Sequence, residues 1–212
     1  MDMWLSAVDP KLRTLRDFKA GQQIGLPASD SIEALALQKG AEDQLGNAHA
    51  LDVSMLAISH PLGEQSLFTG QLAGHLTAPP FQFQEVDRGA HVVFSSKDAF
   101  GESTFNAAAM TTAFYEQYPD FAKAFLNYMM RADQLIARDS ATAGKIVAEA
   151  EGRPQDASKY KAWMTHAGDS YTVVPSGFFK YAAFMRKIGI ITKVPSNVKD
   201  IELPPLQSRS GS

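Results

Sequence analysis

The 212-residue sequence contains no cysteine. This absence excludes disulfide scaffolds, thiolate zinc sites, iron–sulfur clusters and cysteine nucleophiles. Basic residues are not in excess either, because 20 lysines and arginines stand against 23 aspartates and glutamates, for a formal net charge of −3. A protein whose main activity is nucleic-acid binding needs basic side chains to neutralise phosphates. The charge balance therefore argues against that class.

Long hydrophobic runs are also missing, and no stretch reaches the ~18 apolar residues of a membrane helix. The first ten residues carry Asp2 and Asp9 and no basic cluster before their short apolar run, so they do not follow the pattern of a signal peptide. The composition, 45% hydrophobic and 20% charged, is typical of a globular protein with an apolar core.

The common catalytic motifs are absent as well. The sequence has no G-x-S-x-G, no G-x-x-x-x-G-K-[ST] and no G-x-G-x-x-G. None of its five histidines lies four residues from another, so no metal ligands and no cofactor are expected. The carboxylates Glu33, Glu42, Asp43 and Glu116 fall on predicted helix faces, where solvation is the usual state, so no catalytic pair is expected.

Residues 22–95 alternate between strand-like and helix-like segments, which is typical of an α/β fold. Apolar runs closed by proline or glycine and good N-cap residues define the segments. The predicted strands are 3–8, 23–27, 51–59, 72–77 and 90–95, and the predicted helices begin at 32, 64 and 81. We expect a small parallel or mixed sheet with helices on both faces.

The chain after residue 100 is expected to be mostly helical. Apolar residues at helical spacing, with proline, aspartate or serine at the starts, predict helices over 119–136, 141–150, 158–166 and 178–188. Residues 104–112 are apolar enough to begin either a strand or a helix.

Polar loops follow two of the predicted strands at the place where α/β sheets bind ligands. Ser29-Asp30-Ser31 leads into a helix N-terminus, whose free N–H groups and dipole favour an anion, although simple helix capping is the alternative. Residues 77–82 occupy the equivalent place after the strand 72–77, and Phe81 is expected either to face a ligand or to pack in the core. Residues 101–106 form a third polar loop.

Several segments resemble one known family. Residues 16–19 (R-D-F-K) followed by 24–27 (I-G-L-P) are similar to the D-L-K-G-K-K-I-G-V-P segment of type II periplasmic binding proteins. Residues 67–82 (L-F-T-G-Q-L-A-G-H-L-T-A-P-P-F-Q) resemble the pattern L-L-S-G-x-I-x-A-H-F-x-S-P-P-F-Q of the nitrate/sulfonate/taurine (NitT/TauT-type) substrate-binding proteins of ABC importers. The resemblance runs from about residue 3 to residue 205.

The resemblance implies two lobes joined by hinge strands, which close on a ligand in the cleft. Residues 1–16 would form a hinge strand and connector, 17–98 the second lobe with the returning hinge strand, and 99–212 the helix-rich part of the first lobe with the terminal tail. The implied function is capture of a small anionic or polar organic solute of the sulfonate, nitrate or taurine class for an ABC permease, outside the cytoplasm and without chemistry. The implied ligand-binding residues are Ser29, Asp30, Ser31, Thr77, Pro80, Phe81, Gln82, Thr104 and Asn106.

Two other functions stay open. Some relatives on this fold resemble enzymes of thiamine-precursor or menaquinone biosynthesis, and such an enzyme needs a convergent histidine, lysine or carboxylate in the cleft. The chain could instead be a fragment that does not bind ligand.

Members of the resembled family carry an export signal and the first strands of lobe one before the segment that matches Met3. On this resemblance the chain is expected to correspond to the carboxyl-terminal two thirds of such a protein. It would then expose an apolar face on helices 119–136 and 178–188, and associate with itself or with the missing amino-terminal segment. The residues expected on that face are Phe121, Phe125, Met129, Phe184 and Met185.

Overall fold

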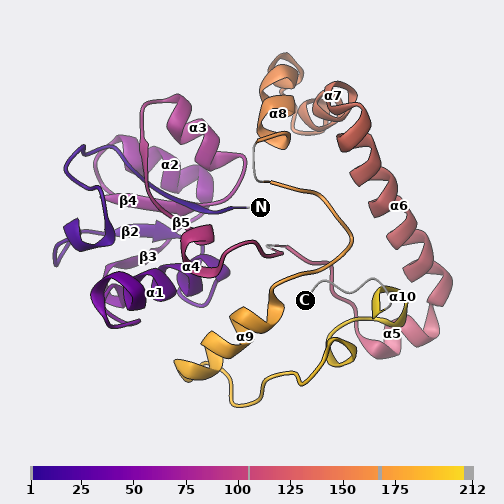
Figure 1. The fold of residues 1–212 in the computed structure, drawn as a ribbon. Coiled ribbons are helices and arrows are strands. Elements are labelled where there is room, and N and C mark those ends of the chain that lie inside the picture. Colours follow the sequence, from indigo (N-terminus) through magenta and orange to yellow (C-terminus); the bar gives the residue numbers. More distant parts are fainter. Residues whose placement is uncertain (1, 105, 167–168, 208–212) are drawn as a thin grey trace. The chain divides into compact units, whose positions relative to one another are not determined.

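The computed structural model describes residues 2–104, 106–166 and 169–207, and within them the chain divides into two compact units (Figure 1). We call Asp2–Glu102 together with Phe184–Ile190 the sheet unit. The described parts of Ser103–Ala183 and Ile191–Ser212 are the helical unit. Each unit is described by itself.

A mixed five-stranded sheet forms the centre of the sheet unit. Its strands, in the spatial order β3-β2-β4-β1-β5, are β1 (Trp4–Ala7), β2 (Ile24–Leu26), β3 (Met55–Ala57), β4 (Gly74–Thr77) and β5 (His91–Ser95). The strand β2 is parallel to β3 and β4, whereas β1 is antiparallel to β4 and β5. The predicted small mixed sheet is confirmed. Whether β1 and β5 also serve as hinge strands stays a prediction.

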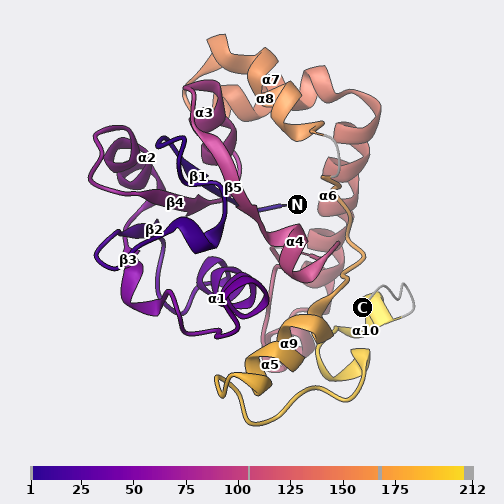
Figure 2. The ribbon, with the colours of Figure 1, turned by 60° about the vertical axis from the view of Figure 1, so that its left-hand side comes forward.

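Helices cover both faces of this sheet, as predicted (Figure 2). One face carries α1 (Ile32–Leu45) and α4 (Ser96–Phe100), and the other carries α2 (His60–Phe68) and α3 (Phe81–Asp87). Short 3-10 turns lie at Leu15–Asp17 and Asp52–Ser54. The α/β fold class is therefore confirmed.

The core of the sheet unit is built from the apolar positions of the strands and α1. Leu5, Ile24, Leu26 and Leu76 of the strands are completely buried, and burial of apolar surface of this kind is the main favourable term in folding. The helix α1 begins where the hydroxyl of Ser31 accepts a hydrogen bond from the amide of Ala34, which is the N-cap arrangement expected from the sequence.

A glycine lets α2 approach the sheet directly over a histidine. A Cβ atom at Gly63 would lie 2.4 Å from Nε2 of His75 in β4, which is closer than a Cβ atom can approach another heavy atom. Only glycine therefore permits this packing of α2 against β4. His75 is completely buried as a result.

The helical unit has no strand among its described residues. Its helices are α5 (Thr112–Gln117), α6 (Pro119–Arg138), α7 (Ser140–Ala150), α8 (Ala157–Met164), the first part of α9 (Phe178–Lys187) and α10 (Pro204–Gln207), with 3-10 turns at Pro154–Asp156 and Val198–Asp200. The helices α7 and α8 pack closely, because Gly144 leaves room for the backbone at Lys161. No helix in the described ranges is long and apolar enough to cross a membrane.

Several predicted boundaries are wrong. The helix α2 begins at His60 rather than at residue 64, because Pro61 fits the first turn of a helix, where no backbone N–H is needed. The strand β3 covers only Met55–Ala57 of the predicted 51–59, and a 3-10 turn precedes it. The described residues among 104–111 form no regular element.

The predicted apolar face is confirmed on α6 and wrong on α9. Phe121, Phe125 and Met129 of α6 are 53%, 37% and 43% exposed. Phe184 of α9 is buried, because its ring packs on Phe100 of the sheet unit, with ring centroids 5.7 Å apart. Met185 is partly buried.

Candidate functional site

The loops that follow β2, β3 and β4 lie at the same edge of the sheet, because these three strands are parallel. The loops lead into α1, α2 and α3, so the N-termini of three helices also gather there. Ligands of open α/β sheets bind outside the carboxyl ends of the strands, and helix N-termini offer free N–H groups and a positive dipole end. We take this edge as the candidate site.

His60 lies at the centre of the edge, as the first residue of α2. Its Nδ1 atom is 2.8 Å from the hydroxyl of Thr77 and 3.5 Å from Nε2 of His75, both in β4. Its Nε2 atom is 3.8 Å from a carboxylate oxygen of Glu33 in the first turn of α1. The ring of Phe81 lies 5.4 Å from the His60 ring, centroid to centroid. Four elements therefore meet at one imidazole.

A second carboxylate lies behind His75. Nδ1 of His75 is 2.5 Å from Oε1 of Glu85 in α3, and both side chains are completely buried. Glu33, His60, His75 and Glu85 thus form a continuous row, which we call the histidine chain. No lysine or arginine in the described part of the protein pairs with any of its members.

Several buried polar atoms of α3 and β1 have no hydrogen-bond partner among the described residues. They are the second carboxylate oxygen of Glu85, both amide atoms of Gln82 and the hydroxyl of Ser6, which lies opposite His75 in the sheet. Buried polar groups of this kind are ordinarily satisfied by ordered water or by a ligand. The interior behind His60 is therefore polar and able to take further hydrogen bonds.

His60 has a lowered pKa. Burial is the largest cause, because it disfavours the charged imidazolium, and the neighbouring His75 lowers the pKa further. The carboxylate of Glu33 acts in the opposite direction and raises it. The imidazole of His60 is therefore mainly neutral at pH 7, where it can both donate and accept a hydrogen bond.

The residues predicted from the loop after β2 are at the edge, with different roles. Ser31 caps α1, as the helix-capping alternative predicted, because its hydroxyl oxygen accepts a hydrogen bond from the amide of Ala34. Its hydroxyl hydrogen can still be donated to a ligand. Ser29 and Asp30 are exposed on the loop. Their binding roles stay predictions.

The residues predicted around the end of β4 are Thr77, Pro80, Phe81 and Gln82. Thr77 and Phe81 lie beside His60, and Pro80 and Gln82 are the sequence neighbours of Phe81. Thr77 is completely buried and bonded to His60, and Phe81 is partly exposed beside the same ring rather than packed wholly in the core. Pro80 is the N-cap residue of α3, and Gln82 is the completely buried amide described above. Thr77 and Phe81 therefore share one neighbour, His60.

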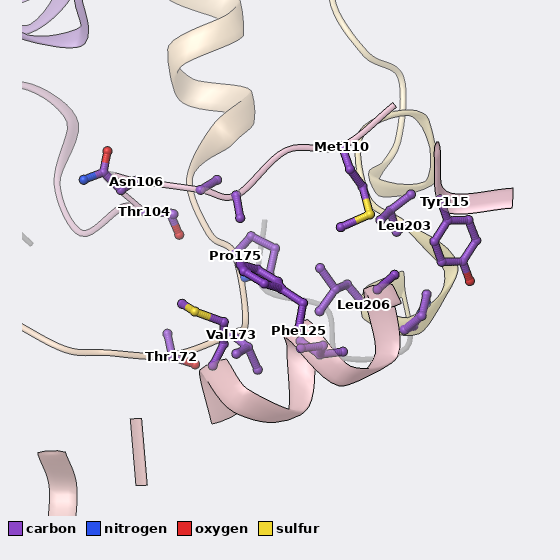
Figure 3. Close-up of a pocket in the computed structure, with 16 residues that line it drawn as sticks. Thr104, Asn106, Met110, Tyr115, Phe125, Thr172, Val173, Pro175, Leu203 and Leu206 are labelled. Atoms are coloured by element: carbon purple, nitrogen blue, oxygen red, sulfur yellow. The ribbon is translucent and has the colours of Figure 1, made fainter. Parts of the chain in front are cut away.

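Thr104 and Asn106 belong to the helical unit. There they line a pocket of about 160 Å³ together with apolar side chains such as Met110, Phe125 and Leu206 (Figure 3). Thr104 is fixed by two hydrogen bonds of 2.8 Å to the backbone of Ser176. The polar side chains of Thr104 and Asn106 lie at one end of the pocket and Tyr115 and Leu203 at the other (Figure 3).

All four members of the histidine chain, Glu33, His60, His75 and Glu85, are absent from the residues that the sequence predicted for the site. The expectation that Glu33 is solvated is wrong, because this side chain is 6% exposed and faces His60. His60 follows β3 just as the polar loops follow β2 and β4. Its position after a predicted strand was the sequence feature from which it could have been predicted as a site residue. The described residues contain no group of three or more histidine, cysteine, aspartate or glutamate side chains arranged to hold a metal ion.

Comparison with known proteins gives one family and one fold. The model of the NMT1-like family matches residues 11–150. No curated protein sequence matches the chain.

Three solved structures share the fold at low identity. A ligand-binding component of an ABC-type import system from Staphylococcus aureus is 18% identical, with a TM-score of 0.69, over 99% of this chain and 70% of that one. The periplasmic aliphatic sulphonate binding protein SsuA from Escherichia coli is 15% identical, with a TM-score of 0.69, over 96% and 65%. The alkanesulfonate-binding protein SsuA from Xanthomonas axonopodis pv. citri bound to MOPS is 16% identical, with a TM-score of 0.68, over 100% and 69%. The chain thus spans 65% to 70% of the length of these structures.

The lowered pKa of His60 can be measured by NMR titration of the imidazole protons. We expect a midpoint below the ordinary value of 6.5. Glu33→Gln should lower the midpoint further, because it removes the carboxylate that favours the imidazolium. The exposed His49, which pairs with Asp52 outside the site, serves as the internal control and should not respond to Glu33→Gln. A midpoint at or above 6.5, or one that ignores Glu33→Gln, would contradict the described geometry.

Proposed function

Because this chain belongs to the NMT1-like family, whose model covers residues 11–150, we propose that it is a solute-binding component of an ABC importer. The solute is a small anionic or polar organic molecule of the sulfonate, nitrate or taurine class, and the partner is the permease of the importer. The shared fold with binding proteins of ABC importers supports this proposal, and so does the resemblance of residues 67–82. Such a protein works outside the cytoplasm.

The observation that carries the proposal is the gathering of helix N-termini and polar side chains at one edge of the sheet. The N-terminus of α1 offers free amides beside Ser29 and Ser31, and the start of α2 offers His60. Free amides, hydroxyls and an imidazole recognise the oxygen atoms of a polar head group by hydrogen bonds. Phe81 supplies an aromatic surface next to them.

The pocket of the helical unit supports the organic part of the proposal. Its lining is mostly apolar, so it is suited to a short carbon chain or ring, with Thr104 and Asn106 as polar contacts at one end. In a two-lobed binding protein each lobe supplies one wall of the cleft and the ligand is enclosed on closure.

A second candidate is acid–base chemistry on the bound solute. The histidine chain provides the convergent histidines and carboxylates that the enzyme alternative requires. Mass spectrometry of a solute recovered after prolonged incubation separates the two, because a binding protein returns it unchanged.

A thermal-shift screen tests the proposed function. The panel contains methanesulfonate, taurine, nitrate and bicarbonate, with pyrimidine precursors of thiamine as representatives of the alternative. A solute at 100 times its Kd should stabilise the fold by ~2.7 kcal/mol, because it binds only the native state. An unchanged Tm with every member of the panel, confirmed by calorimetry, would count against a binding role for these solutes.

The double variant Ser29→Ala, Ser31→Ala tests the loop after β2. We expect weaker binding of the solute found in the screen, because two hydroxyl donors are lost next to the N-terminus of α1. The fold should survive, since loss of the Ser31 cap costs ~1 kcal/mol. Isothermal calorimetry measures the affinity, and Ser170→Ala in the helical unit, at an exposed position, is the matched control. Equal affinities of the double variant and the unchanged protein would remove this loop from the site.

The apolar face of α6 supports a proposal about partners. Phe121, Phe125, Tyr128 and Met129 are all more than a third exposed, and soluble monomers seldom leave large apolar patches in water. The helical unit has no strand among its described residues on which this face could pack. We propose that the face is covered by the further segment of the family fold or, without it, by a second copy of the chain.

Light scattering and binding of a hydrophobic dye test whether the apolar face of α6 needs a partner. The 212-residue chain should self-associate or bind the dye. Phe121→Ser with Phe125→Ser should reduce both, because it removes two exposed rings. Val53→Ser, at an 83% exposed position in the sheet unit, is the matched control and should change neither. A monomer at high concentration that binds no dye would show that no such face needs a partner.

A further inference from the structure

The candidate site contains no permanent positive charge among its described residues. Its titratable members are Asp30 on the loop after β2 and Glu33, His60, His75 and Glu85 of the histidine chain, and no described lysine or arginine pairs with them. An oxyanion at this edge therefore finds three carboxylates and, apart from helix N-termini, only imidazoles that can become positive. The hydroxyls of this edge can donate hydrogen bonds to an anion, but a positively charged side chain can come only from a protonated histidine.

His60 is the member of the histidine chain that a solute can reach. Its side chain is 23% exposed, whereas that of Glu33 is 6% exposed and those of His75 and Glu85 are completely buried. The Nδ1 side of the ring is held by Thr77 and His75, which leaves Nε2 facing Glu33 and the N-terminus of α1. A proton added to His60 therefore places its charge where the proposed anion site lies.

We propose that His60 is neutral in the empty site and takes up one proton from solution when an anionic solute binds. This inference rests on the proposed function, and it specifies that the anion and the proton bind together. The proton is exchanged with solvent, so no covalent bond is formed or broken.

The groups that face His60 are consistent with such coupling. From α1, Glu33 favours the imidazolium, and from β4, His75 disfavours it. From α3, Phe81 contributes an uncharged ring, while Glu85 lies behind His75 and the buried residues of β2 carry no charge. Burial disfavours the charge of His60 in the empty site, and an anion beside the ring compensates for that cost.

Linkage gives the direction of the effect. A bound anion raises the pKa of His60. The affinity for the solute is therefore higher at low pH, where His60 is already protonated in the empty site, than at high pH, where it is neutral. Between the pKa of the empty site and that of the filled site, affinity falls by up to about tenfold per pH unit as the pH rises. Below both pKa values, the affinity no longer depends on the pH through this group.

Calorimetry with methanesulfonate and with nitrate tests the inference. Titrations at pH 7 in Bis-Tris and in Tris, two cationic buffers of different ionisation enthalpy, report the protons taken up. We expect uptake approaching one proton per anion bound and a Kd that rises from pH 6.5 to pH 8. His60→Gln should abolish both effects, and His49→Gln, an exposed histidine outside the site, should keep them. Anion binding without proton uptake, or with a Kd that does not change with pH, would overturn the inference.

A second measurement uses the unchanged protein, so it tests the inference even if His60→Gln does not fold. In the unchanged protein at pH 7, addition of methanesulfonate or nitrate should move the His60 ring resonances to imidazolium positions and leave those of His49 in place. Binding of neutral or cationic solutes alone would overturn this inference and leave a binding function intact. Binding of no solute in the panel would overturn both.

Discussion

The buried contact between His75 and Glu85 is the interaction on which the candidate site depends. Removing one partner of such a pair leaves a buried polar group uncompensated, which typically costs about 3–5 kcal/mol if it is charged. Because His75 lies in β4 and Glu85 in α3, the contact holds α3 against the sheet. Gly63 brings the first turn of α2 onto the other nitrogen of the same ring. The position of His60 therefore follows from a contact made behind it, out of reach of solvent.

The strands and helices of the sheet unit could be predicted because their signals are local. An apolar run ended by proline, or the N-cap at Ser31, needs no knowledge of distant residues, and the loops at Ser31 and Thr77 followed from the rule for parallel strands. The histidine chain could not be predicted in this way, because its members come from α1, α2, β4 and α3 and no spacing in the sequence reveals their convergence. Glu33 shows the difficulty: a carboxylate on a helix is solvated unless another element supplies a partner, as His60 does here.

The helices α6 and α9 show the same limit in the packing of apolar faces. Both carry aromatic residues at helical spacing, and that pattern predicts a face that avoids water without naming what covers it. Phe184 of α9 packs on Phe100, and the ammonium group of Lys39 lies 5.9 Å from the centroid of the Phe184 ring. On α6, Phe121 packs on Phe114 and Phe125, its own neighbours along the chain, and stays 53% exposed. The amphipathic pattern thus predicted that each face needs a packing partner, but it did not predict which element or chain that partner is.

A site whose positive charge comes from a histidine differs physically from one built on arginine. A guanidinium at this edge would stay charged at every pH, would pair with Glu33 in the empty protein, and would have to leave that partner before it could bind a solute. His60 has a lowered pKa, so the empty site avoids both a desolvated cation and a strong ion pair with Glu33. The Glu33 carboxylate still favours the imidazolium once a proton arrives, and the buried His75 and Glu85 hold the ring in place throughout. On the proposal that the anion and the proton bind together, the charge of the site is a consequence of occupancy rather than a fixed property of the fold.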